Sequence, residues 1–159
     1  MCVNGPVLRI LLLVLLLGVS YCERKCNYSE ILVSYRKIIY VELQHLNLTS
    51  SFNTSNERDR CIAGKKQGIL HSIHGLVHKF LCHKRDEGRC QRNDAQEGML
   101  RTVCMMKHLI IRNCNPSTLQ NMHVKTSNWC PKRKKKKIEL MRALKTCWQK
   151  LQSVFIPTK

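Results

Sequence analysis

Acidic residues are scarce in this chain, which has 10 Asp and Glu residues against 28 Lys and Arg residues in 159 positions. So few carboxylates leave little material for acid–base catalysis. The sequence also lacks the Gly-x-Ser-x-Gly turn of serine hydrolases, a glycine-rich phosphate loop and the His-Glu-x-x-His zinc motif. We therefore expect that the protein is not an enzyme and uses no cofactor.

Long apolar runs are also rare. The run Ile10–Leu17 follows Arg9 and precedes small residues, which is the pattern of a secretory signal peptide. It is well short of the roughly 20 residues that a membrane-spanning helix needs. We assign residues 1–22 to a signal peptide and residues 23–159 to one secreted domain.

Cysteines, in contrast, are abundant. Cleavage after Cys22 removes two of the ten cysteines and leaves an even number, whereas cleavage after Ser20 retains Cys22 and an odd number. The small residues Gly18 and Ser20 fit cleavage after Ser20, and cleavage after Cys22 is the other option. Behind a signal peptide, so many cysteines predict disulfides. Three glycosylation sequons, at Asn27, Asn47 and Asn53, agree with export.

Positive charge dominates the surface chemistry. The formal charge is +18, and subtracting Arg9 leaves +17 for residues 23–159. Such a charge attracts acidic partners, including sulfated glycans and acidic receptor faces. Six consecutive basic residues form a candidate glycan-binding run: Lys132, Arg133, Lys134, Lys135, Lys136 and Lys137. The alternative is a solvated, protease-sensitive loop.

Helical periodicity recurs in four segments: 28–46, 62–82, about 95–112, and from near Ile138 to Phe155. The helical stripe of the first segment comprises Ile31, Tyr35, either Ile38 or Ile39, either Glu42 or Leu43, and Leu46. The apolar stripe of the third segment comprises Met99, Val103, Met106 and Ile110. Asp94 and Glu97 form a capping-box pattern before the third helix. Cations oppose the helix macrodipole at a helix N-terminus, so most of the basic run is expected before the last helix.

The segments between these helices are predicted to be loops, with lengths of about 14, 12 and 25 residues at 47–60, 83–94 and 113–137. Long connections before the second and fourth helices permit crossovers. The sequence shows no internal repeats and no strand-like alternation. We therefore predict an all-α fold, a four-helix up-up-down-down bundle with long crossover loops and disulfide bridges.

Three histidines, His71, His74 and His78, share one face of the predicted second helix. Such a face could bind zinc, but metal sites usually draw ligands from other elements as well. We interpret these residues as a basic surface and predict no metal site.

The sequence Lys145-Thr146-Cys147-Trp148-Gln149-Lys150-Leu151 resembles the last helix of the interleukin-7 and thymic stromal lymphopoietin group of short-chain helical cytokines. Residues 60–65 and 79–81 are similar to the start and end of that group's second helix, and residues 110–114 to the end of its third. The start of the mature chain, Cys26-Asn27-Tyr28-Ser29, and the basic run agree with the same group.

This resemblance implies two disulfides. Cys114 would pair with Cys26, or with Cys22 if that residue is retained, and Cys61 would pair with Cys147. The group's third bridge has no counterpart, because residues 47–60 contain no cysteine. For the four remaining cysteines we expect Cys82 with Cys90 and Cys104 with Cys130.

The resemblance also implies that the protein bridges a receptor α chain of the interleukin-7 type and a common γ chain, and so activates Janus kinases and STAT proteins. This activity would support lymphocyte growth and survival, with the protein acting as a monomer and binding no nucleic acid. The α-chain site would lie on the first and third helices, with Glu30, Ser34, Lys37 and Val41 on the first. The γ-chain site would centre on Trp148, near the edge of the apolar stripe, with Lys145, Gln149 and Lys150 around it.

Two alternatives remain open from the sequence. One is a thymic stromal lymphopoietin-like cytokine with a different second subunit. The other is a cationic, heparin-binding or host-defence protein without a dedicated receptor, which the high positive charge would favour.

Overall fold

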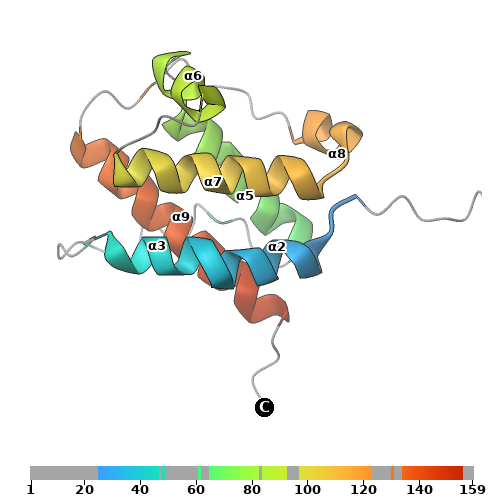
Figure 1. Cartoon of the computed structure of the whole chain (residues 1–159). Coiled ribbons are helices and arrows are strands. Elements are labelled where there is room, and N and C mark those ends of the chain that lie inside the picture. The colour runs from blue at the N-terminus through green and yellow to red at the C-terminus, as the bar shows by residue number, and fades with distance from the viewer. Residues whose placement is uncertain are drawn as a thin grey trace, which may run out of the picture.

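The computed structural model describes residues 25–46, 48, 61, 65–82, 84–92, 97–122, 130 and 134–155. These residues are mostly helical, as predicted, and form no β-strand among themselves (Figure 1). None of the described helices has the length and apolar character needed to cross a membrane. The elements in chain order are α2 (Tyr28–Ser34), the π-helical segment η1 (Tyr35–Ile39), α3 (Tyr40–His45), α5 (Lys66–Phe80), α6 (Lys84–Arg92), α7 (Gly98–Asn113), α8 (Pro116–Asn121) and α9 (Lys134–Phe155).

The segments α2, η1 and α3 form one uninterrupted helical rod. It begins at Asn27, whose side-chain oxygen accepts a hydrogen bond from the backbone N–H of Glu30 at 3.3 Å. In its middle, the N–H of Tyr40 donates to the carbonyl of Tyr35, which is the i→i+5 bond of a π-helix. The wider turn moves the apolar stripe by one residue. Ile39 and Leu43 are therefore buried, while Ile38 is 50% exposed, which decides the alternatives that periodicity left open.

This rod packs antiparallel to α7, and the two form the front layer in Figure 1. At one end, the disulfide Cys26–Cys114 joins the start of α2 to the end of α7. At the other end, Arg101 donates to Glu42 at 2.7 Å. A Cβ on Gly98 would lie only 3.2 Å from Leu46, so the absent side chain permits this close approach. The predicted apolar residues of the third helix are buried: Met99, Val103, Met106 and Ile110.

Helices α5 and α9 form the second layer and also run antiparallel, crossing behind the first layer (Figure 1). The disulfide Cys61–Cys147 ties α9 to the segment before α5. The ammonium of Lys66, at the start of α5, lies 3.8 Å from the ring centroid of Phe155, at the end of α9. The core between the layers includes Ile69, Ile73, Val77, Phe80, Leu140, Leu144, Trp148 and Leu151, each at most 2% exposed.

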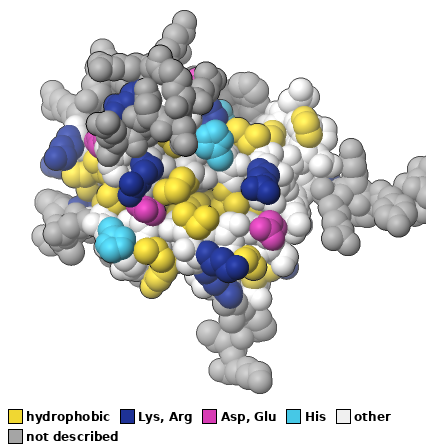
Figure 2. All heavy atoms as spheres, in the orientation of Figure 1, with side chains coloured by type: hydrophobic (Ala, Val, Ile, Leu, Met, Phe, Trp, Pro, Cys, Tyr) yellow, Lys and Arg dark blue, Asp and Glu magenta, His cyan; other side chains and the backbone are white. Residues whose placement is uncertain are grey.

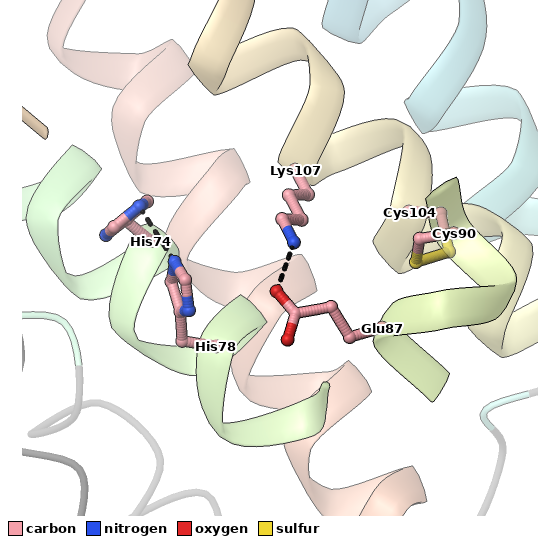
Figure 3. Close-up of polar contacts among 6 residues, drawn as sticks. All are labelled: His74, His78, Glu87, Cys90, Cys104 and Lys107. Carbon is pink, nitrogen blue, oxygen red and sulfur yellow. Dashed lines mark hydrogen bonds and ion pairs between the residues drawn. A yellow bond between two sulfur atoms is a disulfide. The ribbon is translucent and has the colours of Figure 1, made fainter. Parts of the chain in front are cut away.

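Helix α6 corrects the prediction of a loop over 83–94. Its own sequence carries little apolar periodicity, so three contacts with other elements hold it. The disulfide Cys90–Cys104 links it to α7, and Lys107 of α7 donates to Glu87 at 2.7 Å (Figure 3). Asp86 accepts from Lys137 of α9 at 3.0 Å. Because these contacts join residues far apart in sequence, local patterning could not predict the helix.

Other helix boundaries also differ from the predictions. Helix α7 begins at Gly98 rather than near Ala95, and its N-cap residue, Glu97, makes no side-chain capping bond. Asp94, the other member of the predicted capping box, lies outside the described residues. Within the predicted connection, Pro116 opens the short helix α8.

Helix α9 begins at Lys134 rather than near Ile138, so part of the basic run is helical. Two ion pairs offset the unfavourable cations in its first turns: Lys136 contacts Glu139 at 3.2 Å, and Lys137 contacts Asp86.

All eight cysteines after residue 22 are paired in disulfides. The two bridges that the resemblance implied, Cys26–Cys114 and Cys61–Cys147, are present. The other two predicted pairs were wrong: Cys82 pairs with Cys130, and Cys90 pairs with Cys104. The reason is the helical conformation of α6, which turns Cys90 toward α7 and leaves Cys82 to reach the segment before α9.

Candidate functional site

A groove between the first rod and α7 is the main candidate site. It has a volume of about 230 Å³ and is lined by both apolar and polar side chains. The rod contributes one wall and α7 the other, because the antiparallel packing aligns them along their length. The lining residues are Glu30, Ser34, Ile38 and Ile39 from the rod, and Met105, His108, Leu109, Arg112 and Asn113 from α7.

One residue that lines this groove, Ile38, has an apolar side chain that is 50% exposed. Val41 and Ile111 lie on the same two helices outside the groove lining, and they are 46% and 45% exposed. Figure 2 shows this face: hydrophobic side chains gather in its middle, with basic, acidic and His side chains around them. An apolar centre with a charged surround is typical of a protein-binding surface.

The four residues predicted on the first helix do not all share this groove. Glu30 and Ser34 line it, and the Ser34 hydroxyl lies 3.5 Å from a carboxylate oxygen of Glu30. Lys37 and Val41 are exposed but do not line the groove. Ile38 and the lining residues of α7 were not among the predicted site residues. The one signal for Ile38 was its place beside Ile39, where helical periodicity allows only one of the two to be buried.

Trp148 corrects the prediction of an exposed receptor anchor. Its side chain is 0% exposed and stacks on Tyr35, with ring centroids 4.8 Å apart. In this conformation a partner cannot reach its indole ring. The apolar stripe of α9 therefore includes Trp148 at its centre, because the rod packs over this turn of α9.

The other residues predicted on α9 lie at its surface to different degrees. Gln149 is exposed, and Lys145 is half-buried. Lys150 is also half-buried and donates to the backbone carbonyl of Cys61 at 3.1 Å, which strengthens the link made by the neighbouring disulfide. This face is thus polar, without the apolar anchor that was expected.

Burial also affects the chemistry of Tyr35. Removal of its hydroxyl from water raises its pKa to about 12, and the nearby Tyr40 contributes to the increase. Tyr35 is therefore a neutral core residue at any physiological pH, and it adds no charge to the groove.

The basic run is divided by the fold. Lys134, Lys135 and Lys136 are exposed, whereas Lys137 is half-buried and paired with Asp86. Lys132 and Arg133 lie outside the described residues. The part available to an external glycan therefore does not include Lys137, whose ammonium is engaged between α6 and α9.

Of the three predicted glycosylation sites, the structure describes only Asn27. This residue is exposed, and its side-chain oxygen caps α2. Asn47 and Asn53 lie outside the described residues.

The chain matches none of the protein-family models, curated proteins or solved structures with which it was compared.

Proposed function

We propose that this protein is a secreted helical cytokine of the interleukin-7 and thymic stromal lymphopoietin group, which acts by bridging two receptor subunits. The observation that carries the proposal is the groove between the rod and α7. It lies between the two helices on which the resemblance locates the receptor α-chain site. The exposed side chain of Ile38 would supply an apolar anchor, and Glu30 and Arg112 would supply charge at the edges.

An up-up-down-down bundle is part of this proposal, and the contacts at one end of the molecule support it. Tyr28 at the start of α2 lies against Phe155 at the end of α9, with ring centroids 5.5 Å apart. Lys66 at the start of α5 contacts the same ring, and Cys114 after α7 is bonded to Cys26. The first two helices would thus start at the end where the last two finish.

The second receptor subunit would bind the polar face of α9, through Lys145 and Gln149. Trp148 would act beneath this face as part of the core. A common γ chain is the first candidate for this subunit, and the subunit used by thymic stromal lymphopoietin is the alternative. Assembly of both receptor chains would activate Janus kinases and STAT proteins and support the growth of lymphocytes.

The test is STAT phosphorylation in cells that carry the matching receptor α chain, compared with the same cells without it. The matched variants are Ile38→Asp, inside the groove, and Val33→Asp, which is 41% exposed but does not line the groove. We expect Ile38→Asp to weaken binding to the α-chain ectodomain about tenfold or more, because a charge would enter an apolar contact. Val33→Asp should bind as the wild type does.

Signalling that survives removal of the α chain would contradict the proposal, and so would equal binding by the two variants. A cationic heparin-binding or host-defence protein is favoured by the exposed lysines at the start of α9. Heparin retention or membrane lysis without STAT phosphorylation would support that function instead.

A further inference from the structure

Two histidines on α5 face one another at close range. The Nε2 atoms of His74 and His78 lie 3.1 Å apart, one helical turn from each other (Figure 3). His74 is 7% exposed, while His78 is half-buried and open to solvent on one side. Packing thus holds one imidazole in place and leaves the second within reach of a solute.

This spacing is close to that of two ligands on one metal ion. Zinc binds imidazole nitrogen at about 2.0–2.1 Å, so two nitrogens on a tetrahedral ion lie about 3.3 Å apart. We propose that His74 and His78 form a binding site for a divalent transition-metal ion, with Zn²⁺ as the leading candidate. The helix already holds the nitrogens at nearly the required separation, so little ordering is needed when the ion binds.

The protons on the two imidazole rings can be rearranged to allow metal binding. In the free protein, one imidazole donates its Nε2 proton to the Nε2 of the other. If the donor imidazole shifts to its other neutral tautomer, with the proton on Nδ1, its Nε2 atom also has a free lone pair. Both Nε2 lone pairs then point toward the position that the metal ion would occupy. Two neutral imidazoles can then coordinate the ion without net proton release.

The surroundings tolerate a cation but do not complete a closed site. Glu87 of α6 faces this region, and the hydrogen bond from Lys107 is the first cause that lowers the pKa of its carboxyl group. The ammonium group of Lys107 supplies a positive charge that balances the negative charge of Glu87. Among the described residues, no group of three His, Cys, Asp or Glu side chains could hold a metal. Water would fill the remaining positions, so the site would be exchangeable rather than structural.

This inference revises the sequence prediction of no metal site. His71 was grouped with the other two because all three share a face, but only His74 and His78 are brought together by the fold. The i, i+4 spacing places their rings one above the other, with centroids 4.4 Å apart.

The experiment is a calorimetric titration of the full-length mature protein with zinc chloride near pH 7.5, with thermal unfolding measured in parallel. We expect one Zn²⁺ per chain and a higher midpoint of unfolding with zinc, because the folded state holds the two ligands together. His78→Gln should weaken this binding about tenfold or more. His45→Gln, an exposed residue on α3, is the control and should bind as the wild type does.

Wild-type protein that binds no zinc, or His78→Gln protein that binds it unchanged, would overturn the proposal. If the His78→Gln protein does not fold, the imidazole NMR signals of the wild-type protein test the site instead. The signals of His74 and His78 should shift together when zinc is added. Zinc-induced shifts confined to other histidines would reject the site. No receptor enters these measurements, so the result is independent of the proposed cytokine function.

Discussion

Trp148 on α9 lies flat against Tyr35 in η1, with ring centroids 4.8 Å apart and ring planes only 6° from parallel. Both side chains have 0% exposure. The stack joins the last helix to the first at the π-helical turn, where the register of the first helix changes. The residue that most suggested a receptor contact in the sequence therefore has a structural role, beneath the surface that carries Ile38.

Replacement of Trp148 by alanine is expected to destabilise the fold. Loss of a fully buried tryptophan costs about 3–5 kcal/mol in unfolding free energy, since a cavity remains. Urea unfolding followed by circular dichroism measures the change. The neighbouring variant Gln149→Ala, at an exposed position, should stay within about 0.5 kcal/mol of the wild type. A Trp148→Ala protein with wild-type stability but weaker receptor binding would contradict the structural role.

The lysines at the start of α9 are expected to separate into two functional groups. Lys137→Ala leaves the Asp86 carboxylate buried without its ion-pair partner, and this costs about 1–3 kcal/mol of stability or more. Lys134→Ala changes an exposed residue, so stability should be retained while the salt concentration for elution from heparin falls. Thermal unfolding and heparin chromatography of both variants check the division. Equal effects of the two substitutions on heparin elution would argue against it.

Acidification is expected to weaken the contact between α6 and α7. The pKa of Glu87 is lowered from its ordinary value of 4.5, chiefly by the hydrogen bond from Lys107. A group with a depressed folded-state pKa contributes stability that is present above 4.5 and lost as the pH falls through the folded-state value. Glu87 is 45% exposed, so solvent screening keeps the contribution small.

Urea unfolding across the acid range measures this effect. Glu87→Gln should flatten the dependence of stability on pH, and Lys107→Met should flatten it in the same way, because each substitution removes the pair. A double variant should add little to either single variant. If Lys107→Met left the pH dependence unchanged, the ion pair would not be its source.

Local periodicity predicted the longest elements well. The helices near 28–46, 95–112 and 138–155 are present because their apolar residues recur on one face, and this pattern requires only nearby residues. The resemblance around Cys147 likewise indicated the bridge to Cys61. The groove could be anticipated only as a pairing of the first and third helices, since its α7 residues carry no distinguishing motif.

The failures share a cause. Helix α6 lacks an apolar stripe and depends on Cys104, Lys107 and Lys137, which come from other helices. Periodicity allowed either Ile38 or Ile39 as the core residue, and the π-helical turn decided between them. The cysteine pairs outside the resemblance depended on the same long-range geometry.

The sequence by itself determined the helical class, the strong positive charge and the positions of the main helices, because composition and spacing act over a few residues. Tertiary structure decided that Trp148 is buried, that Ile38 faces solvent, and that His74 and Lys137 lie in partly enclosed sites. Which side of a helix is covered depends on the elements packed against it, and no local pattern contains that information.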